Sequence, residues 1–292
     1  MKRGTLYLVG TPIGNMGDLS RRAEEVLRTV DRIAAEDTRR TGALLERIGS
    51  RVPALSFYAR NEERRVPELL RLLLEGRSVA VVSDAGNPGI ADPAERLVRA
   101  ALEEGIEVVP VPGPSAFLAA LVASGLSTRR FRFEGFLPSR EGPRLDRLRV
   151  LAAEEGTLVF YESPRRIRRL LEEIAGAMGE RRVVLARELT KKFEEFLRGT
   201  ASELAAGFDE RPPRGEFVVL VEGAKGGERL PRERVLDLVR EETAAGASLR
   251  DAVRAAASTA GWKEQEVYRL LRGGDREEPE SPGGGSGDLP GT

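Results

Sequence analysis

Three charged residues, Glu36, Asp37 and Arg39, directly follow an apolar run, Arg32–Ala35, that predicts a short β-strand. In α/β proteins, ligands bind at the ends of strands. A carboxylate at such a place can accept a proton, and an arginine can stabilise a developing negative charge. The alternative interpretation is that Glu36 and Asp37 cap the next helix.

A second charged group follows another predicted strand, Val183–Arg187, and contains Glu188, Lys191 and Lys192. Lys191 is the candidate here for stabilising an oxyanion or for holding RNA. The alternative is that Lys191 and Lys192 form a solvated face that touches phosphate.

The chain of 292 residues contains no cysteine and no histidine. Disulfides and thiolate chemistry are therefore excluded. Because histidine is absent, the commonest general base and the commonest metal ligand are also missing. Zinc sites are seldom built from carboxylates alone, so we expect no metal site.

The chain has 47 basic and 47 acidic residues, so its formal net charge is zero. The C-terminal segment is acidic, however, so the rest of the chain has an excess of basic residues. Residues 1–274 hold 46 basic and 42 acidic residues, a net charge of +4. An RNA partner would therefore need a local basic face. No apolar stretch is long enough to span a membrane or to form the core of a signal peptide, so we expect a cytoplasmic protein.

Three loops are made almost entirely of small or rigid residues, and each follows a predicted strand: residues 10–15, 83–89 and 112–116. Glycine allows the backbone to approach a ligand closely, and proline reduces the entropy that a loop loses on binding. Each loop alone is compatible with a simple tight turn. Three at successive strand ends indicate a ligand that is bound by main-chain groups.

The first part of the chain alternates strands with amphipathic helices, which predicts a parallel sheet covered by helices. We expect helices to begin at Asp92-Pro93 and at Ser115, and Pro67 to lie in the first turn of another. The predicted organisation is an N-terminal α/β lobe (1–124), a second α/β lobe (125–224), a helical module (231–272) and a disordered tail (273–292). In the module, we expect Ser248 to cap a helix and Trp262 to lie in a small core.

Seven segments in order resemble the RsmI family of the tetrapyrrole-methylase superfamily. They are GTLYLVGTPIGNMGDLS, IAAEDTRRT, VVSDAGNPGIADP, VPGPSAFLAAL, FEGFLP, FYESPRRI and LARELTKKFEEF. The resemblance covers roughly residues 4–222, and the helical module resembles that family's C-terminal extension.

The resemblance implies two α/β lobes with S-adenosylmethionine (SAM) in the cleft between them. It implies methylation of the ribose 2′-hydroxyl of a cytidine in the decoding region of small-subunit (16S) ribosomal RNA, and a homodimer. The residues that it places at the cofactor are Pro12, Asp84, Gly86, Asn87, Ile90, Ser115, Ala116, Tyr161, Ala186 and Glu216. Asp84 has an alternative role as a residue that stabilises its loop.

This chain departs from the family pattern in three places. Arg60 and Arg165 stand where the family usually has histidine, so no scheme that needs histidine applies. Asn87 stands where the family usually has threonine, which leaves a backbone role for this position.

Two basic stretches are candidates for contacting RNA: residues 129–149, where arginines are interleaved with phenylalanines, and residues 165–169. Phe131, Phe133 and Phe136 have strand-like spacing, and we expect at least two of them to face the core. Two other functions remain open. One is a tetrapyrrole or protein side-chain methylase of the same fold, and the other is a non-catalytic RNA- or ribosome-binding protein.

Overall fold

The computed structural model describes residues 3–90, 94–210, 212–224, 230–262 and 264–272. The chain divides into two compact units, residues 1–224 and 225–292. The larger unit contains two five-stranded sheets. The tail predicted to be disordered, 273–292, lies outside the described residues. Within the described part of the chain, no helix is long and apolar enough to cross a membrane.

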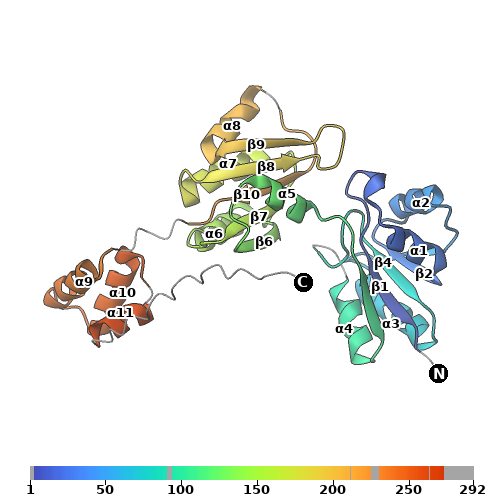
Figure 1. The fold of residues 1–292 in the computed structure, drawn as a ribbon, viewed down its shortest axis with the longest axis horizontal. Helices are drawn as coiled ribbons and strands as arrows, with labels where there is room; N and C mark the ends of the chain where they lie inside the picture. Colours follow the sequence, from blue (N-terminus) through green and yellow to red (C-terminus); the bar gives the residue numbers. More distant parts are fainter. Residues whose placement is uncertain (1–2, 91–93, 211, 225–229, 263, 273–292) are drawn as a thin grey trace, which may run out of the picture. The chain divides into compact units, whose positions relative to one another are not determined.

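The first sheet is parallel throughout and has the strand order β3-β2-β4-β1-β5 (Figure 1). Its strands are β1 (Thr5–Val9), β2 (Arg32–Ala35), β3 (Ala54–Ser56), β4 (Val79–Val82) and β5 (Glu107–Val111). The helices between them are α1 (Arg21–Thr29), α2 (Thr38–Arg47), α3 (Glu62–Leu74) and α4 (Glu95–Glu103), and a 3-10 turn, η1 (Met16–Asp18), precedes α1.

Helices cover both faces of this sheet. Leu27 of α1 and Leu45 of α2 pack on one face, and Leu69 of α3 and Leu97 of α4 pack on the other. All four residues of β4 are buried as a result, which explains why its sequence, VAVV, is apolar without alternation. The alternating strand-and-helix pattern therefore predicted the parallel sheet correctly.

The second sheet is mixed and has the order β6-β7-β10-β8-β9. Its strands are β6 (Phe131–Phe136), β7 (Thr157–Glu162), β8 (Arg182–Arg187), β9 (Glu195–Thr200) and β10 (Phe217–Val221). Only β6 and β7 run parallel; the other neighbouring strands are antiparallel. Its helices are α5 (Ala116–Ser124), α6 (Glu141–Leu151), α7 (Ile167–Met178) and α8 (Ala201–Glu210).

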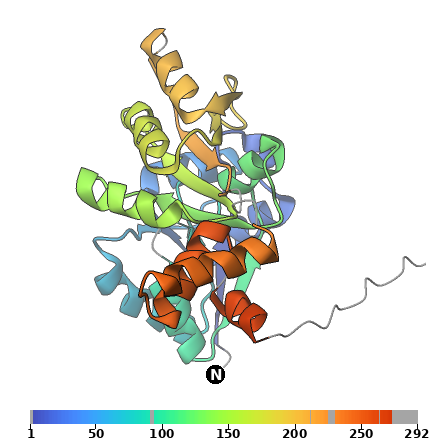
Figure 2. The ribbon, with the colours of Figure 1, turned by 90° about the vertical axis from the view of Figure 1, so that its left-hand side faces the viewer.

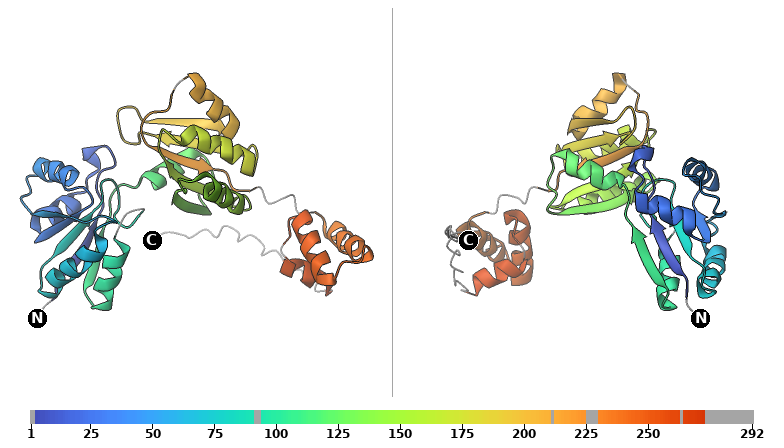
Figure 3. Two further views of the ribbon diagram at one scale, coloured as in Figure 1. Left: turned by 180° about the vertical axis from the view of Figure 1, so that it is seen from behind. Right: turned by 45° about the vertical axis from the view of Figure 1, so that its right-hand side comes forward.

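The helices of this lobe also divide between the two faces of the sheet (Figure 3). Leu148 of α6, Leu171 of α7 and Ala205 of α8 share one core with β7, β8 and β10. On the opposite face, α5 packs through Ala120 and Leu121 against a core that also includes Ile13 from the loop after β1. The N-terminal lobe therefore contributes a side chain to the core of the second.

Several helix ends differ from the sequence predictions. Pro67 is the sixth residue of α3 and therefore lies beyond the first turn, where the sequence pattern predicts it. Ser115 occupies the N-cap position of α5 but its side chain makes no capping hydrogen bond. Helix α4 begins at Glu95, and Asp92 and Pro93 lie outside the described residues.

The prediction that at least two phenylalanines of β6 face the core is wrong. Phe131 is 43% exposed and Phe136 is 60% exposed, whereas Phe133 is partly buried and stacks on Phe117. Strand β6 is at the edge of its sheet, where side chains have neighbours on one side only. An irregularity between Phe133 and Gly135 also shifts the register, so strict alternation is lost.

The smaller unit contains α9 (Arg232–Ala244), α10 (Leu249–Ala260) and α11 (Glu264–Leu271) (Figure 2). Ser248 caps α10 as the sequence predicts, accepting a hydrogen bond from the Asp251 backbone N–H. Trp262 packs against the core of this unit, also as predicted, and its indole N–H donates to the Leu230 carbonyl at 3.0 Å.

A buried ion pair joins α6 to α7. Arg144 and Glu173 form two hydrogen bonds of 2.6 and 2.7 Å, and their side chains are 5% and 9% exposed. Arg144 also donates to the carbonyls of Pro138 and Ser139. The pair therefore fixes the segment that follows β6.

We expect Glu173→Ala to lower the free energy of unfolding by about 3–5 kcal/mol, because it leaves the Arg144 guanidinium buried without a counterion. Glu172→Ala is the matched control on the same helix. Glu172 is half exposed and its ion pair with Arg168 should contribute less than about 1 kcal/mol. Urea unfolding followed by circular dichroism measures both, and equal losses would contradict the expectation.

Candidate active site

The three small-residue loops meet because their strands are neighbours. Strand β1 lies between β4 and β5, and all three run in the same direction. The loop after β1 pairs with the loop after β4 through two backbone hydrogen bonds between Thr11 and Gly86, of 2.8 and 3.1 Å. The buried Thr11 hydroxyl also donates to the Ser83 carbonyl at 3.1 Å.

The loops after β1 and β5 cross at two glycines. A Cβ added to Gly113 would lie 2.7 Å from the carbonyl carbon of Gly10, and one added to Gly10 would lie 2.5 Å from the Asn87 side-chain oxygen. Asn87 also donates to the Pro114 carbonyl at 3.3 Å. Only residues without side chains fit this crossing, which accounts for the glycines in both loops.

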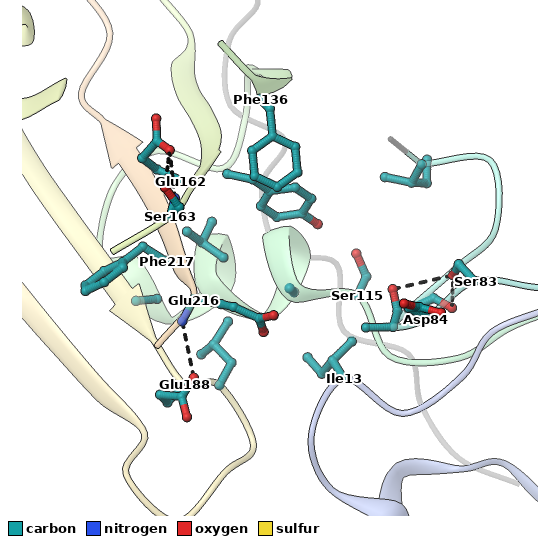
Figure 4. A pocket seen from close by; sticks show the side chains of 18 of the residues that line it. Ile13, Ser83, Asp84, Ser115, Phe136, Glu162, Ser163, Glu188, Glu216 and Phe217 are labelled. Atoms are coloured by element: carbon teal, nitrogen blue, oxygen red, sulfur yellow. Dashed lines mark hydrogen bonds between the residues drawn. The ribbon is translucent and has the colours of Figure 1, made fainter. Parts of the chain in front are cut away.

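A cavity of about 450 Å³ lies between these loops and the second lobe. Figure 4 shows Ser83, Asp84 and Ser115 on one side of it, and Glu162, Glu188, Glu216 and Phe217 on the other. Eleven of the residues proposed from the sequence line it: Glu36, Asp84, Gly86, Asn87, Ile90, Ser115, Ala116, Tyr161, Ala186, Lys191 and Glu216. Pro12, Asp37 and Arg39 do not.

The second sheet supplies one row of residues across three strands. Val218 of β10 pairs with Tyr161 of β7 on one side and with Ala186 of β8 on the other, and all three line the cavity. Burial raises the pKa of the Tyr161 phenol, and its ring contacts Phe133 and Phe136. This wall of the cavity is therefore apolar and aromatic.

Glu36 and Asp84 tie the ends of β2 and β4 together. A Glu36 carboxylate oxygen accepts a hydrogen bond from the Asp84 backbone N–H at 3.2 Å, and the Asp84 carboxylate accepts one from the Asp37 backbone N–H at 3.0 Å. Arg40 lies 3.4 Å from the other Asp84 oxygen. Asp84 therefore stabilises its loop while it also lines the cavity.

Asp37 caps α2, in agreement with the alternative interpretation of this residue. Its carboxylate accepts hydrogen bonds from the backbone and the side chain of Arg39. These hydrogen bonds lower the pKa of Asp37 to about 2, so it is a weak base. Arg39 is 89% exposed and lies outside the cavity lining.

Lys191 sits between two carboxylates at the edge of the cavity. Its ammonium donates to Glu188 at 3.0 Å and to Glu216 at 3.1 Å. Burial alone would lower the pKa of Lys191, but these hydrogen bonds outweigh it and raise the pKa. Burial is the largest single influence on Glu188 and would raise its pKa. Hydrogen bonds from Lys191 and from the Glu216 backbone N–H, with the charges of Lys191 and Arg187, together outweigh burial and lower the pKa of Glu188. Lys191 is therefore a fixed cation at neutral pH.

The loop that carries Lys191 touches the other lobe. A Cβ added to Gly14 would lie 2.5 Å from the Lys191 Cγ and 3.0 Å from the Thr190 hydroxyl. Glu188 and Thr190 both have positive φ angles, 50° and 64°, which non-glycine residues rarely adopt. This loop therefore holds two strained residues against the N-terminal lobe.

Sequence reasoning missed Glu162, Ser163 and Arg40 as cavity residues. Glu162 is buried, its Oε1 accepts hydrogen bonds from the backbone and hydroxyl of Ser163, and its Oε2 lies 3.0 Å from Arg166. The segment YESPRRI contains the signal, a strand that ends in a carboxylate and a serine. The sequence gives no signal that separates Arg40 from its neighbour Arg39, so it does not show which of the two arginines lines the cavity.

Most arginines of the two basic stretches already have acidic partners. Arg132 and Arg147 bind Glu134, Arg130 pairs with Glu155, and Arg168 and Arg169 pair with acids of their own lobe. Among the described residues of these stretches, Arg129, Arg140 and Arg165 form no ion pair. The clusters therefore carry much less net charge than their composition suggests.

A family model for tetrapyrrole (corrin/porphyrin) methylases matches residues 5–205. Solved structures have the same fold. Cobalt precorrin-4 methyltransferase aligns with a TM-score of 0.57 and 20% identity, over 75% of this chain and 94% of that one. Uroporphyrin-III-C-methyltransferase from Thermus thermophilus aligns with a TM-score of 0.54 and 22% identity, over the same shares. The two-lobed fold is thus that of the tetrapyrrole methylases.

More similar relatives carry a different name. This chain is 45% identical over 270 residues to ribosomal RNA small subunit methyltransferase I of Synechocystis, covering 91% of this chain and 97% of that one. It is 46% identical over 273 residues to the protein of that name from Escherichia coli O157:H7, covering 91% and 94%. The chain belongs to the ribosomal RNA small subunit methyltransferase I family, within the tetrapyrrole methylases.

We expect Gly113→Ala to destabilise the protein by about 1–3 kcal/mol, because the new methyl group collides with the Gly10 backbone. The matched control is Gly42→Ala, in α2, where an added Cβ meets nothing within 4 Å. That substitution should stabilise the helix by about 0.5–1 kcal/mol. Thermal unfolding measures the Tm of both variants. A change of Tm in the same direction for both would contradict the claim that the crossing excludes a side chain at Gly113.

Proposed function

We propose that this protein transfers a methyl group from SAM to the ribose 2′-hydroxyl of a cytidine in the decoding region of small-subunit ribosomal RNA, in the cytoplasm. The observation that carries the proposal is the match to ribosomal RNA small subunit methyltransferase I over nearly the whole length of both chains. The solved tetrapyrrole methylases are much less similar, at 20–22% identity, and support the fold alone.

The cavity fits SAM in size, charge and polar groups. Its volume lies in the range that proteins use for small ligands. Five carboxylates and two cations line it, and this excess of negative charge suits a sulfonium: Glu36, Asp84, Glu162, Glu188, Glu216, Arg40 and Lys191. When bound, SAM supplies a methyl group activated by its positive sulfur.

We propose that the three loops hold the cofactor mainly through backbone groups. Gly86 and Asn87 line the cavity in the loop after β4, and Ser115 and Ala116 line it at the N-terminus of α5. Because the Ser115 side chain does not cap α5, its hydroxyl and the first-turn amides are suited to polar groups of a ligand. Tyr161, Ala186 and Glu216 would bind from the second lobe.

The two candidate reacting groups have different roles in this proposal. Lys191 is a fixed cation, so it suits stabilisation of the negative charge that develops on a ribose oxygen. Glu36 is the carboxylate proposed to accept the proton. Asp37 and Arg39 act indirectly, since the Asp37 backbone N–H holds Asp84 in place.

The proposed assembly is a homodimer. Every residue of α5 except its last, AFLAALVAS, is apolar, a composition typical of a helix that is covered all round. Yet Leu118 is 45% exposed and Val122 is 74% exposed. A second copy of the chain is the partner that we propose for this face.

We expect Lys191→Ala and Glu36→Ala each to reduce the rate of methyl transfer at least about tenfold while SAM affinity changes little. Matched controls are Lys192→Ala, at the next position, and Glu46→Ala, on an exposed turn of α2; both should retain wild-type rates. Transfer of a tritiated methyl group from SAM to small ribosomal subunits that lack this modification measures the rate.

The same assay tests the function itself. Label on one ribose of the RNA supports the proposal. SAM binding in calorimetry without label on subunits or on protein-free RNA would point to another methyl acceptor. Absence of SAM binding would favour a non-catalytic binding protein. Wild-type rates in both active-site variants would contradict the roles of Lys191 and Glu36.

We expect Glu216→Gln to weaken binding of SAM about two- to fivefold more than binding of S-adenosylhomocysteine, because only SAM carries the sulfonium charge. The effect is small since Glu216 is 77% exposed. Glu195→Gln, on β9 outside the cavity, is the control. Calorimetric titration of both ligands measures the ratio, and equal weakening would count against the charge argument.

A further inference from the structure

A second cavity, of about 330 Å³, adjoins the first and has no role in the proposal above. The two cavities share three residues, Arg40, Ser83 and Asp84. The other walls of the second cavity come from the loop after β1 and from α2: Thr11, Pro12, Gly14, Met16, Thr41, Ala43, Leu44 and Arg47. A ligand could therefore extend from one cavity into the other.

Helix α2 presents a single stripe to this cavity. Arg40, Ala43, Leu44 and Arg47 are spaced at i, i+3, i+4 and i+7, so they lie on one face of the helix. The two arginines are separated by two turns, about 10 Å along the axis. Small and apolar side chains lie between them, and Met16 lines the cavity from the opposite loop.

The charge of this stripe is largely uncompensated. Arg47 is exposed and forms no ion pair or side-chain hydrogen bond with any residue that the structure describes. Arg40 is 66% exposed, and its ion pair with Asp84 is loose at 3.4 Å. Many other exposed arginines have close acidic partners, as Arg28 and Arg99 do at 2.6 Å. The cavity thus offers two cations to an anionic ligand.

We propose that the second cavity binds the RNA strand next to the nucleotide that is methylated. Arg40 and Arg47 contact phosphates along the strand, and Leu44 and Met16 form an apolar surface beneath a base or ribose. A single RNA strand binds to proteins through cations that contact its phosphates and through apolar surfaces that contact its bases, and this cavity offers both. The inference rests on the proposed function, and it adds the path by which the substrate reaches the first cavity.

The test is the affinity of the protein for small ribosomal subunits, measured with S-adenosylhomocysteine bound so that no turnover occurs. We expect Arg47→Ala to weaken binding at least about threefold and to reduce the slope of log K against log salt by about 1. Arg47→Lys keeps the charge and should retain most of the affinity. Arg51→Ala is the matched control, since Arg51 is also exposed and without an ion pair among the described residues but does not line the cavity.

Three results would overturn the inference. One is an unchanged affinity and salt slope in Arg47→Ala. The second is an equal effect of Arg51→Ala, which would indicate a general charge effect. The third is a loss of SAM affinity in Arg47→Ala, which would assign the cavity to the cofactor. Failure of the proposed function is seen separately, as SAM binding by the wild-type protein without methyl transfer to RNA.

Discussion

The site depends on one steric constraint, the crossing of Gly10 and Gly113. Parallel neighbours β1 and β5 bring their loops to the same edge of the sheet, and the two backbones pass too closely for any side chain. Thr11 then pairs with Gly86, which adds the loop after β4 to the same wall. Three separate strands are thereby joined into one rigid surface, and the cavity takes its shape from that surface.

Several charged groups of the cavity are held in place by hydrogen bonds or ion pairs. Lys191 is fixed by two carboxylates, and Asp84 is fixed by a backbone amide and by Arg40. Arg40 is held more loosely, at 3.4 Å from Asp84, but the Lys191 ammonium is positioned before a ligand arrives. Such preorganisation is the main source of electrostatic catalysis in enzymes.

The sequence predicted β1, β2, β4 and β5 of the first lobe, because their apolar runs end at glycine-rich or charged loops. It also predicted which loops meet, because neighbouring parallel strands end at one edge. It did not reveal β3, β9, α6 or α8, whose patterns are short or interrupted by charges. Most of the candidate cavity residues came from resemblance to a family. The exposure of Phe131 and Phe136 depends on sheet order, which is a long-range property that local spacing does not encode.

The contact between Gly14 and the loop of Lys191 has a mechanical consequence. The loop after β1 is attached to the first sheet through Thr11, while its tip rests on the aliphatic part of the Lys191 side chain. A movement that separated the lobes would break this contact and free the lysine from one side. The carboxylates that hold its ammonium, Glu188 and Glu216, belong to the same lobe as Lys191, so the charge would stay in place and only the support of the aliphatic chain would be lost.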